Sequence, residues 1–132
     1  MLRIRCATGE VEIEGTRKDY AALRSQLNQL ISAPDIWSIE FVCDAAFDPS
    51  PYEQNCQKMK IEIGSGPNEF SVSDSVLKVE GSSAALMNLG ENLPDDSEIS
   101  EGIIQSHHHY DVYSFPEYVA SDSPAVVLLL KP

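Results

Sequence analysis

The residues most able to do chemistry lie in one segment, Gln105-Ser-His-His-His-Tyr-Asp-Val-Tyr113, which contains all three histidines of the chain. If this segment is a strand, His107, His109 and Asp111 project to one face of a sheet. Two imidazoles and a carboxylate are ligands that Zn²⁺ accepts, and an open coordination position would activate a water molecule. The pattern therefore allows a small metal-dependent enzyme with a His-x-His-x-Asp site.

Two other interpretations of the histidine segment are open. The histidines could belong to a half-buried polar strand that is hydrogen-bonded to its acidic surroundings. The segment could also be a recognition surface, because aromatic side chains are enriched at protein interfaces and several tyrosines lie close by. The candidate binding residues on this interpretation are His107, His109, Tyr110, Asp111, Tyr113 and Tyr118.

A second candidate contact region is acidic. Asp95, Asp96 and Glu98 lie in a stretch with the composition of a loop, where carboxylates are either solvated or in contact with a basic partner. The sequence contains no Gly-x-Ser-x-Gly motif, no phosphate-binding P-loop and no Gly-x-Gly-x-x-Gly fingerprint. We therefore predict no catalytic residues and no cofactor outside the histidine segment.

The charge balance narrows the class of partner. The chain has 21 Asp and Glu residues against nine Lys and Arg residues, which gives a formal net charge of −12. Such a field repels the phosphates of nucleic acids and of anionic lipids, and it attracts basic proteins. We expect a basic protein partner, and no nucleic-acid or membrane partner.

Length and composition predict one globular domain over residues 1–132. The longest apolar run, Ala125 to Leu130, is far shorter than the roughly 20 residues of a membrane-spanning helix. The N-terminus has no signal-peptide pattern, so we expect a cytoplasmic protein. Cys6, Cys43 and Cys56 cannot all pair within the chain, and we expect the first two to be buried thiols. Cys56 precedes a predicted strand and could be exposed.

An internal repeat organises the chain. When the sequence is shifted by 66 residues, Val11-Glu-Ile-Glu-Gly-Thr16 falls on Leu77-Lys-Val-Glu-Gly-Ser82, and the other apolar patterns align without a gap. Each half, residues 1–66 and residues 67–132, is predicted to contain a hairpin, a helix and two further strands. Together these elements predict an α+β fold: a largely antiparallel, eight-stranded sheet with both helices packed on one face.

The helices are predicted from capping residues and apolar stripes. Thr16 with Asp19 resembles a capping box, and it begins a helix that continues to about Ser32. The apolar stripe of this helix consists of Tyr20, Leu23, Leu27, Leu30 and Ile31. Ser82 or Ser83 begins a shorter helix that ends near Gly90.

Two predicted strands have unusual patterns. The strand Ile36 to Cys43 has one strongly apolar face that begins with Trp37. The strand Ala125 to Leu130 is apolar at every position. It is therefore either a central strand or an edge strand completed by another copy of the chain, which makes a homodimer possible.

The C-terminal half resembles a family of small bacterial immunity proteins. The resemblance lies in Leu77-Lys-Val-Glu-Gly-Ser, the leucine-patterned helix after it, the strand His107-His-His-Tyr-Asp111 and the closing Ala120-Ser-Asp-Ser-Pro-Ala-Val-Val-Leu-Leu129. It implies a non-catalytic protein that neutralises a cognate toxin by occluding its active site. It also implies that His107 and His109 form a shared surface feature. The acidic balance suits a basic toxin.

Overall fold

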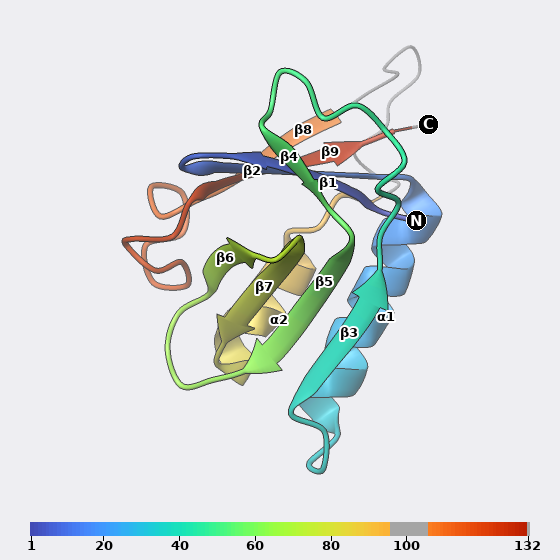
Figure 1. Ribbon diagram of the computed structural model, residues 1–132. Helices are drawn as coiled ribbons and strands as arrows, with labels where there is room; N and C mark the ends of the chain where they lie inside the picture. The colour runs from blue at the N-terminus through green and yellow to red at the C-terminus, as the bar shows by residue number, and fades with distance from the viewer. Residues whose placement is uncertain (96–105, 132) are drawn as a thin grey trace.

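The computed structural model describes residues 1–95 and 106–131, and these residues form two helices and nine strands (Figure 1). The helices are α1 (Arg17–Ser32) and α2 (Ser83–Glu91). The strands are β1 (Arg3–Ala7), β2 (Glu10–Gly15), β3 (Ser38–Val42), β4 (Gln54–Cys56), β5 (Lys58–Ile63), β6 (Glu69–Ser73), β7 (Val76–Gly81), β8 (Ser106–Tyr110) and β9 (Ala125–Leu130). The predicted α+β class is confirmed.

The strands form two sheets, so the predicted single eight-stranded sheet is wrong. One sheet has five strands in the order β4-β1-β2-β9-β8, and the other has four in the order β3-β5-β7-β6. Figure 1 shows the five-stranded sheet on edge above the four-stranded sheet. An alternating apolar pattern determines which face of a strand is buried, but it does not determine which strand lies beside it.

The bounds of the elements repeat at the 66-residue shift. The starts of β1 and β6 (Arg3 and Glu69), of β2 and β7 (Glu10 and Val76) and of the two helices (Arg17 and Ser83) are each 66 residues apart. The two halves exchange their hairpins: β2 pairs in parallel with β9 from the second half, and β7 pairs in parallel with β5 from the first. Each sheet therefore contains strands from both halves.

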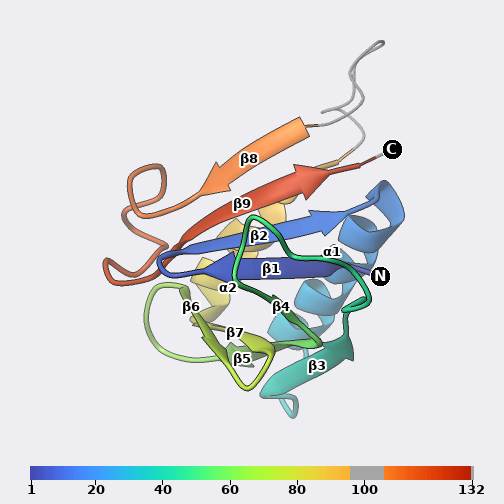
Figure 2. The ribbon, with the colours of Figure 1, turned by 45° about the horizontal axis from the view of Figure 1, so that its top comes forward.

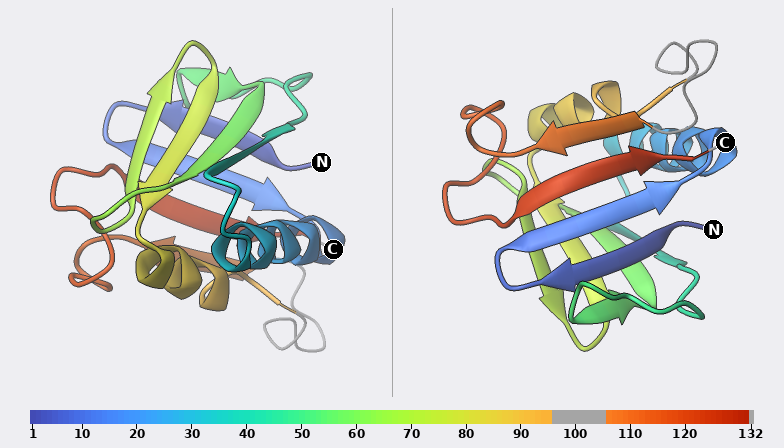
Figure 3. Two further views of the ribbon diagram at one scale, coloured as in Figure 1. Left: turned by 90° about the horizontal axis from the view of Figure 1, so that it is seen from below. Right: turned by 90° about the horizontal axis from the view of Figure 1, so that it is seen from above.

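The helices lie together on one face of the five-stranded sheet (Figure 3, right). Thr16 and Asp19 form the expected capping box at the start of α1, and Ser82 caps α2. Leu23, Leu27 and Leu30 of the predicted stripe are buried. The Arg24 side chain of α1 donates hydrogen bonds to the carbonyl oxygens that end α2, including Leu93 O at 3.1 Å. This contact joins the two helices.

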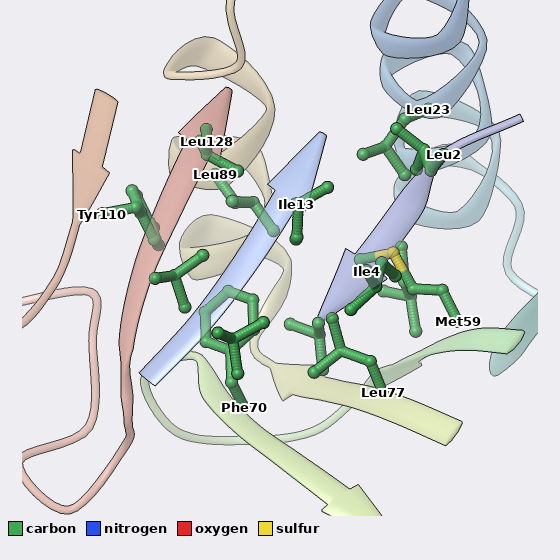
Figure 4. Close-up of a cluster of buried hydrophobic side chains, with 14 of the residues drawn as sticks. Leu2, Ile4, Ile13, Leu23, Met59, Phe70, Leu77, Leu89, Tyr110 and Leu128 are labelled. Atoms are coloured by element: carbon green, nitrogen blue, oxygen red, sulfur yellow. The ribbon is translucent and has the colours of Figure 1, made fainter. Parts of the chain in front are cut away.

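The core lies between the two sheets and the helices (Figure 4). Ile4 and Ile13 of the five-stranded sheet, Met59 and Leu77 of the other sheet, and Leu89 of α2 all belong to it. The Tyr20 hydroxyl of α1 lies 2.8 Å from Ile13 O and 2.9 Å from Leu129 O. It thereby joins α1 to the two parallel strands of the five-stranded sheet.

The apolar strand Ala125–Leu130 is β9, and it lies between β2 and β8 (Figure 2). Its position is the first of the two predicted alternatives, a strand with neighbours on both sides. From Val126 to Leu130 the side chains of β9 are buried on both faces of the sheet, with Val126 at 0% and Leu129 at 5% exposure, whereas Ala125 is exposed. Because β9 has no open edge, it offers no edge for a homodimer.

The segment predicted as a strand over Ile36 to Cys43 is shorter in the structure. It forms β3, Ser38–Val42, at an edge of the four-stranded sheet. Its apolar face is only partly covered, since Trp37 is 73% exposed whereas Cys43 is buried. The predicted continuous apolar strand face is therefore wrong at its first residue, because Trp37 lies outside the core.

All three cysteines are free and buried, as predicted for Cys6 and Cys43, and the exposed position that was open for Cys56 is not found. That residue lies in β4, a short strand that pairs with β1 and was not predicted from the sequence. Burial raises the pKa of Cys43 to about 11 and that of Cys56 to about 12. These side chains therefore remain protonated thiols at neutral pH. Within the described ranges, neither helix is long and apolar enough to cross a membrane.

Candidate functional site

The histidine segment is strand β8, at one edge of the five-stranded sheet (Figure 2). Among the described strands, β8 pairs only with β9 and is therefore an edge strand. His107 lies opposite Leu129, and His109 lies opposite Val127. Both imidazoles are exposed, so the expectation of a half-buried histidine pair is wrong. They face away from the helices, because Tyr110 on the opposite face of the strand is buried in the core.

Tyr110 is 1% exposed, which excludes it as a contact residue for a partner. Its hydroxyl accepts a hydrogen bond from Asn68 Nδ2 at 2.9 Å and donates one to Asn88 Oδ1 at 2.7 Å. Its ring packs edge-on against Phe70 with the ring centroids 6.2 Å apart. Burial raises the pKa of Tyr110 to about 12. Tyr110 is therefore a structural residue that fixes β8 on the core.

The residues after β8 form a loop with an exposed aromatic side chain. Asp111 is half-buried, and its Oδ1 accepts a hydrogen bond from Ser114 N at 2.9 Å, which begins the turn. Tyr113 is 93% exposed, whereas Tyr118 is half-buried. Of the three tyrosines predicted as contact residues, Tyr113 is thus the one whose side chain lies almost entirely in solvent. The Tyr118 side chain is only partly accessible to a partner.

The three predicted metal ligands do not come together. The described residues contain no group of three or more His, Cys, Asp or Glu side chains that could hold a metal ion. Residues two apart on a strand share a face but are separated by nearly 7 Å along it. Asp111 lies beyond the end of β8 and holds the turn through Ser114. The proposed His107, His109 and Asp111 metal site is therefore not formed.

The acidic contact region is described only in part. Asp95 follows α2 and is exposed. Asp96 and Glu98 lie outside the described residues.

A charged cluster that was not predicted from the sequence lies on the outer face of the five-stranded sheet. The carboxylate of Glu14 is 2.7 Å from Arg5 Nη2 and 2.7 Å from Lys131 Nζ, and its side chain is only 5% exposed. The Phe47 ring lies against Arg5, with the guanidinium carbon 5.1 Å from the ring centroid. The hairpin spacing could have indicated part of this cluster, because it places Arg5 opposite Glu12 in the register of β1 and β2. The contact of Lys131 with Glu14 could not be predicted in this way, because Lys131 lies far from the hairpin in the sequence.

We expect the Glu14→Gln variant to lose about 1.5–3 kcal/mol of its free energy of unfolding, because a buried carboxylate with two cationic partners is replaced by a neutral amide. Chemical denaturation of the two proteins measures the difference. Glu40→Gln is the matched control, since Glu40 and Lys58 form an exposed ion pair at 3.2 Å. Its effect should stay below about 1 kcal/mol. Equal losses in both variants would contradict the role assigned to Glu14.

A hollow of about 460 Å³ opens beside the turn between β1 and β2. Its rim includes Glu53 and Asp122, its floor includes Phe70 and Val72, and its lining contains no basic residue. Asp122 belongs to the same loop, between β8 and β9, that carries Tyr113. An acidic hollow and an exposed tyrosine therefore occur on one loop.

The described residues place the three thiols in the core, where burial raises their pKa values, and leave His107 and His109 exposed on β8. What the described residues offer is a contact surface: the exposed side of β8 and the loop that follows it. In comparisons with known proteins, no family model matches the chain and no curated protein matches it, so the resemblance to immunity proteins stays a prediction.

Proposed function

We propose that this protein is a non-catalytic binding protein of the bacterial cytoplasm, an immunity protein that neutralises a basic toxin by covering its active site. The observation that carries the proposal is the exposed contact surface formed by His107 and His109 of β8 and by Tyr113 of the adjacent loop. Exposed aromatic side chains of this kind become the buried anchors of protein interfaces.

The position of β8 at an edge of the described sheet adds a second means of binding. A partner can add a strand of its own to the edge of a sheet. Tyr110 holds β8 in place from the core side through its hydrogen bonds to Asn68 and Asn88. A strand fixed in this way loses little conformational freedom when it binds, which favours affinity.

The distribution of charge supports a basic partner. Within residues 1–95 and 106–131, ion pairs to carboxylates of the same molecule hold basic side chains that include Arg3, Arg5, Lys58, Lys60, Lys78 and Lys131. Ion pairs within the chain do not change its net charge, which is −12. The hollow rimmed by Glu53 and Asp122 could receive a Lys or Arg side chain, with the aliphatic part on Phe70 and Val72. Such a field accelerates the encounter with a basic protein.

We expect the Tyr113→Ala variant to dissociate faster from the toxin, by about tenfold for each 1.4 kcal/mol of contact energy lost. The folded state should not change, because Tyr113 is 93% exposed. Met87→Ala is the matched control, since Met87 is a half-exposed apolar residue of α2 outside the contact surface. Raising the salt concentration should slow association more than it speeds dissociation. Binding kinetics with the purified product of the adjacent gene measure these rates.

The partner is sought next to the gene because immunity genes are expected beside their toxin genes. Co-expression with the product of the adjacent gene should relieve the growth inhibition that this product causes. If inhibition is unchanged and the two proteins do not co-purify at low salt, the proposed function is wrong. If they bind but Tyr113→Ala and Met87→Ala behave alike, the contact surface is wrong.

A further inference from the structure

Strand β3 is one of the two edge strands of the four-stranded sheet, and apolar side chains are exposed at it. Ile36, Trp37 and Val42 are 43%, 73% and 62% exposed. Figure 1 shows β3 at the outer side of this sheet, with α1 running behind it. This edge is separate from the contact surface on β8, which belongs to the other sheet.

The hydrogen bonds to β5 determine which backbone groups of β3 point to the free edge. Trp37 O accepts from Ile63 N at 2.9 Å, and Cys43 N donates to Gln57 O at 2.8 Å. In an antiparallel strand every second residue forms its backbone hydrogen bonds with the same neighbouring strand. Between Trp37 and Cys43, the residues that bond to β5 are therefore Ile39 and Phe41. The N–H and C=O groups of Ser38, Glu40 and Val42 therefore point away from β5.

We propose that two copies of the chain pair through β3, antiparallel to each other, so that their four-stranded sheets become one. Outward-pointing residues must then lie opposite each other. One register places Ser38 opposite Glu40 of the second copy. It also brings the Ile36 side chain beside Val42 of the second copy, while Ile36 N stays bonded to Ala33 O of its own chain. The adjacent register places Glu40 opposite its own counterpart, and like charges directly opposite destabilise a sheet. The first register is therefore the one proposed.

A hollow beside β3 supports a second copy as the occupant of this edge. It measures about 250 Å³, lies between α1 and β3, and is lined by Leu2, Ala22, Leu23, Phe41 and Val42 among others. The proposed register places Trp37 of the second copy opposite Phe41, on the face of the sheet that also contacts α1. The indole can then enter the hollow. Each copy supplies an exposed Trp37 and a hollow that receives one.

The charges at this edge permit self-association in spite of the net charge of −12. Glu40 is the only charged residue of β3, and it is paired with Lys58 of the same chain at 3.2 Å. Beside it, Lys60 and Lys78 are paired with Glu62. Repulsion between two copies is then long-ranged and is screened by salt. Salt should therefore strengthen self-association, whereas it weakens binding to a basic toxin.

Trp37 is the only tryptophan of the chain, so its fluorescence reports directly on this interface. The experiment is sedimentation and tryptophan emission of the full chain from about 1 µM to about 1 mM, a range that spans weak to moderate dissociation constants. We expect a dimer at high concentration and tighter dimerisation at higher salt. The tryptophan emission should shift to shorter wavelength over the same concentration range, because the indole leaves water when the dimer forms.

Three variants locate the interface. Val42→Lys places an ammonium group beside Ile36 of the second copy and should raise the dissociation constant at least about tenfold. Met87→Lys makes the same charge change at an exposed apolar residue of α2 and should leave it unchanged. Glu40→Pro removes an outward N–H without removing a bond to β5, so it should abolish the dimer while the circular dichroism spectrum stays the same.

The proposal is overturned by any of three results. The first is a monomer at the highest concentration. The second is a dimer in which the emission of Trp37 does not shift. The third is a dimer that Val42→Lys and Met87→Lys weaken equally, which would place the interface elsewhere, including on the contact surface of β8.

Discussion

Replacing Leu27 with alanine is expected to lower the free energy of unfolding by about 2–5 kcal/mol, the range for truncating a fully buried leucine. Leu27 is 1% exposed and lies on the buried stripe of α1. Its Cδ1 lies 3.6 Å from the position that a Cβ on Gly90 of α2 would occupy, so it packs where the two helices meet. The loss of stability is expected to be large because truncating Leu27 leaves a cavity between α1 and α2. Both helices are held by other contacts and cannot move together to fill it.

Chemical denaturation of Leu27→Ala and of a control, Gln29→Ala, measures this effect. Gln29 is exposed on the same helix, and alanine is at least as good a helix former, so the control should change stability by less than about 0.5 kcal/mol. A loss below about 1 kcal/mol for Leu27→Ala would show that the helix interface does not contribute as described.

The Gly81→Ala variant is expected to lose about 3 kcal/mol or more, or to fail to fold, because the new methyl group has no space. A Cβ at this residue would lie 2.1 Å from Oδ1 of Asn68, which is 0% exposed. The Asn68 side chain cannot move aside at low cost. Its Nδ2 donates to Ala85 O at 2.8 Å and to the Tyr110 hydroxyl at 2.9 Å.

The control for this variant is Gly66→Ala, since a Cβ at Gly66 has no neighbour within 4 Å. Its stability should stay within about 0.5 kcal/mol of the parent protein. Thermal and chemical unfolding of both variants give the comparison. If Gly81→Ala proves as stable as Gly66→Ala, the buried polar contacts of Asn68 are not where the structure places them.

These two residues also differ in how far the sequence predicts their role. Leu27 belongs to an apolar pattern with helical spacing, and Thr16 with Asp19 marks the start of that helix, so the buried face of α1 follows from local sequence alone. Gly81 could be placed at the end of the second hairpin by the 66-residue repeat. Its closeness to Asn68 follows from the register of that hairpin, in which Glu69 pairs with Glu80. The burial of the Asn68 side chain against Ala85 O and the Tyr110 hydroxyl could not be predicted, because these groups come from α2 and β8.

The candidate site, too, is predicted by the sequence only in part. The alternation over His107 to Tyr110 correctly places His107 and His109 on the face of the strand opposite Tyr110. It does not say which face is buried. Tyr110 is buried because Phe70, Asn68 and Asn88 surround it, and these residues come from the second hairpin, the segment before it and α2.

Local patterns of residues predict the type and bounds of most elements, the two helices with their buried stripes, and the 66-residue repeat. They do not predict that each hairpin pairs with strands of the other half, that β9 has a neighbour on each side or that β3 and β8 are edge strands of the described sheets. The physical reason is that helix caps and side-chain alternation act within a few residues. Strand partners, in contrast, are chosen by the packing of the whole core, in which β2 and β9 lie more than 100 residues apart along the chain and side by side in space.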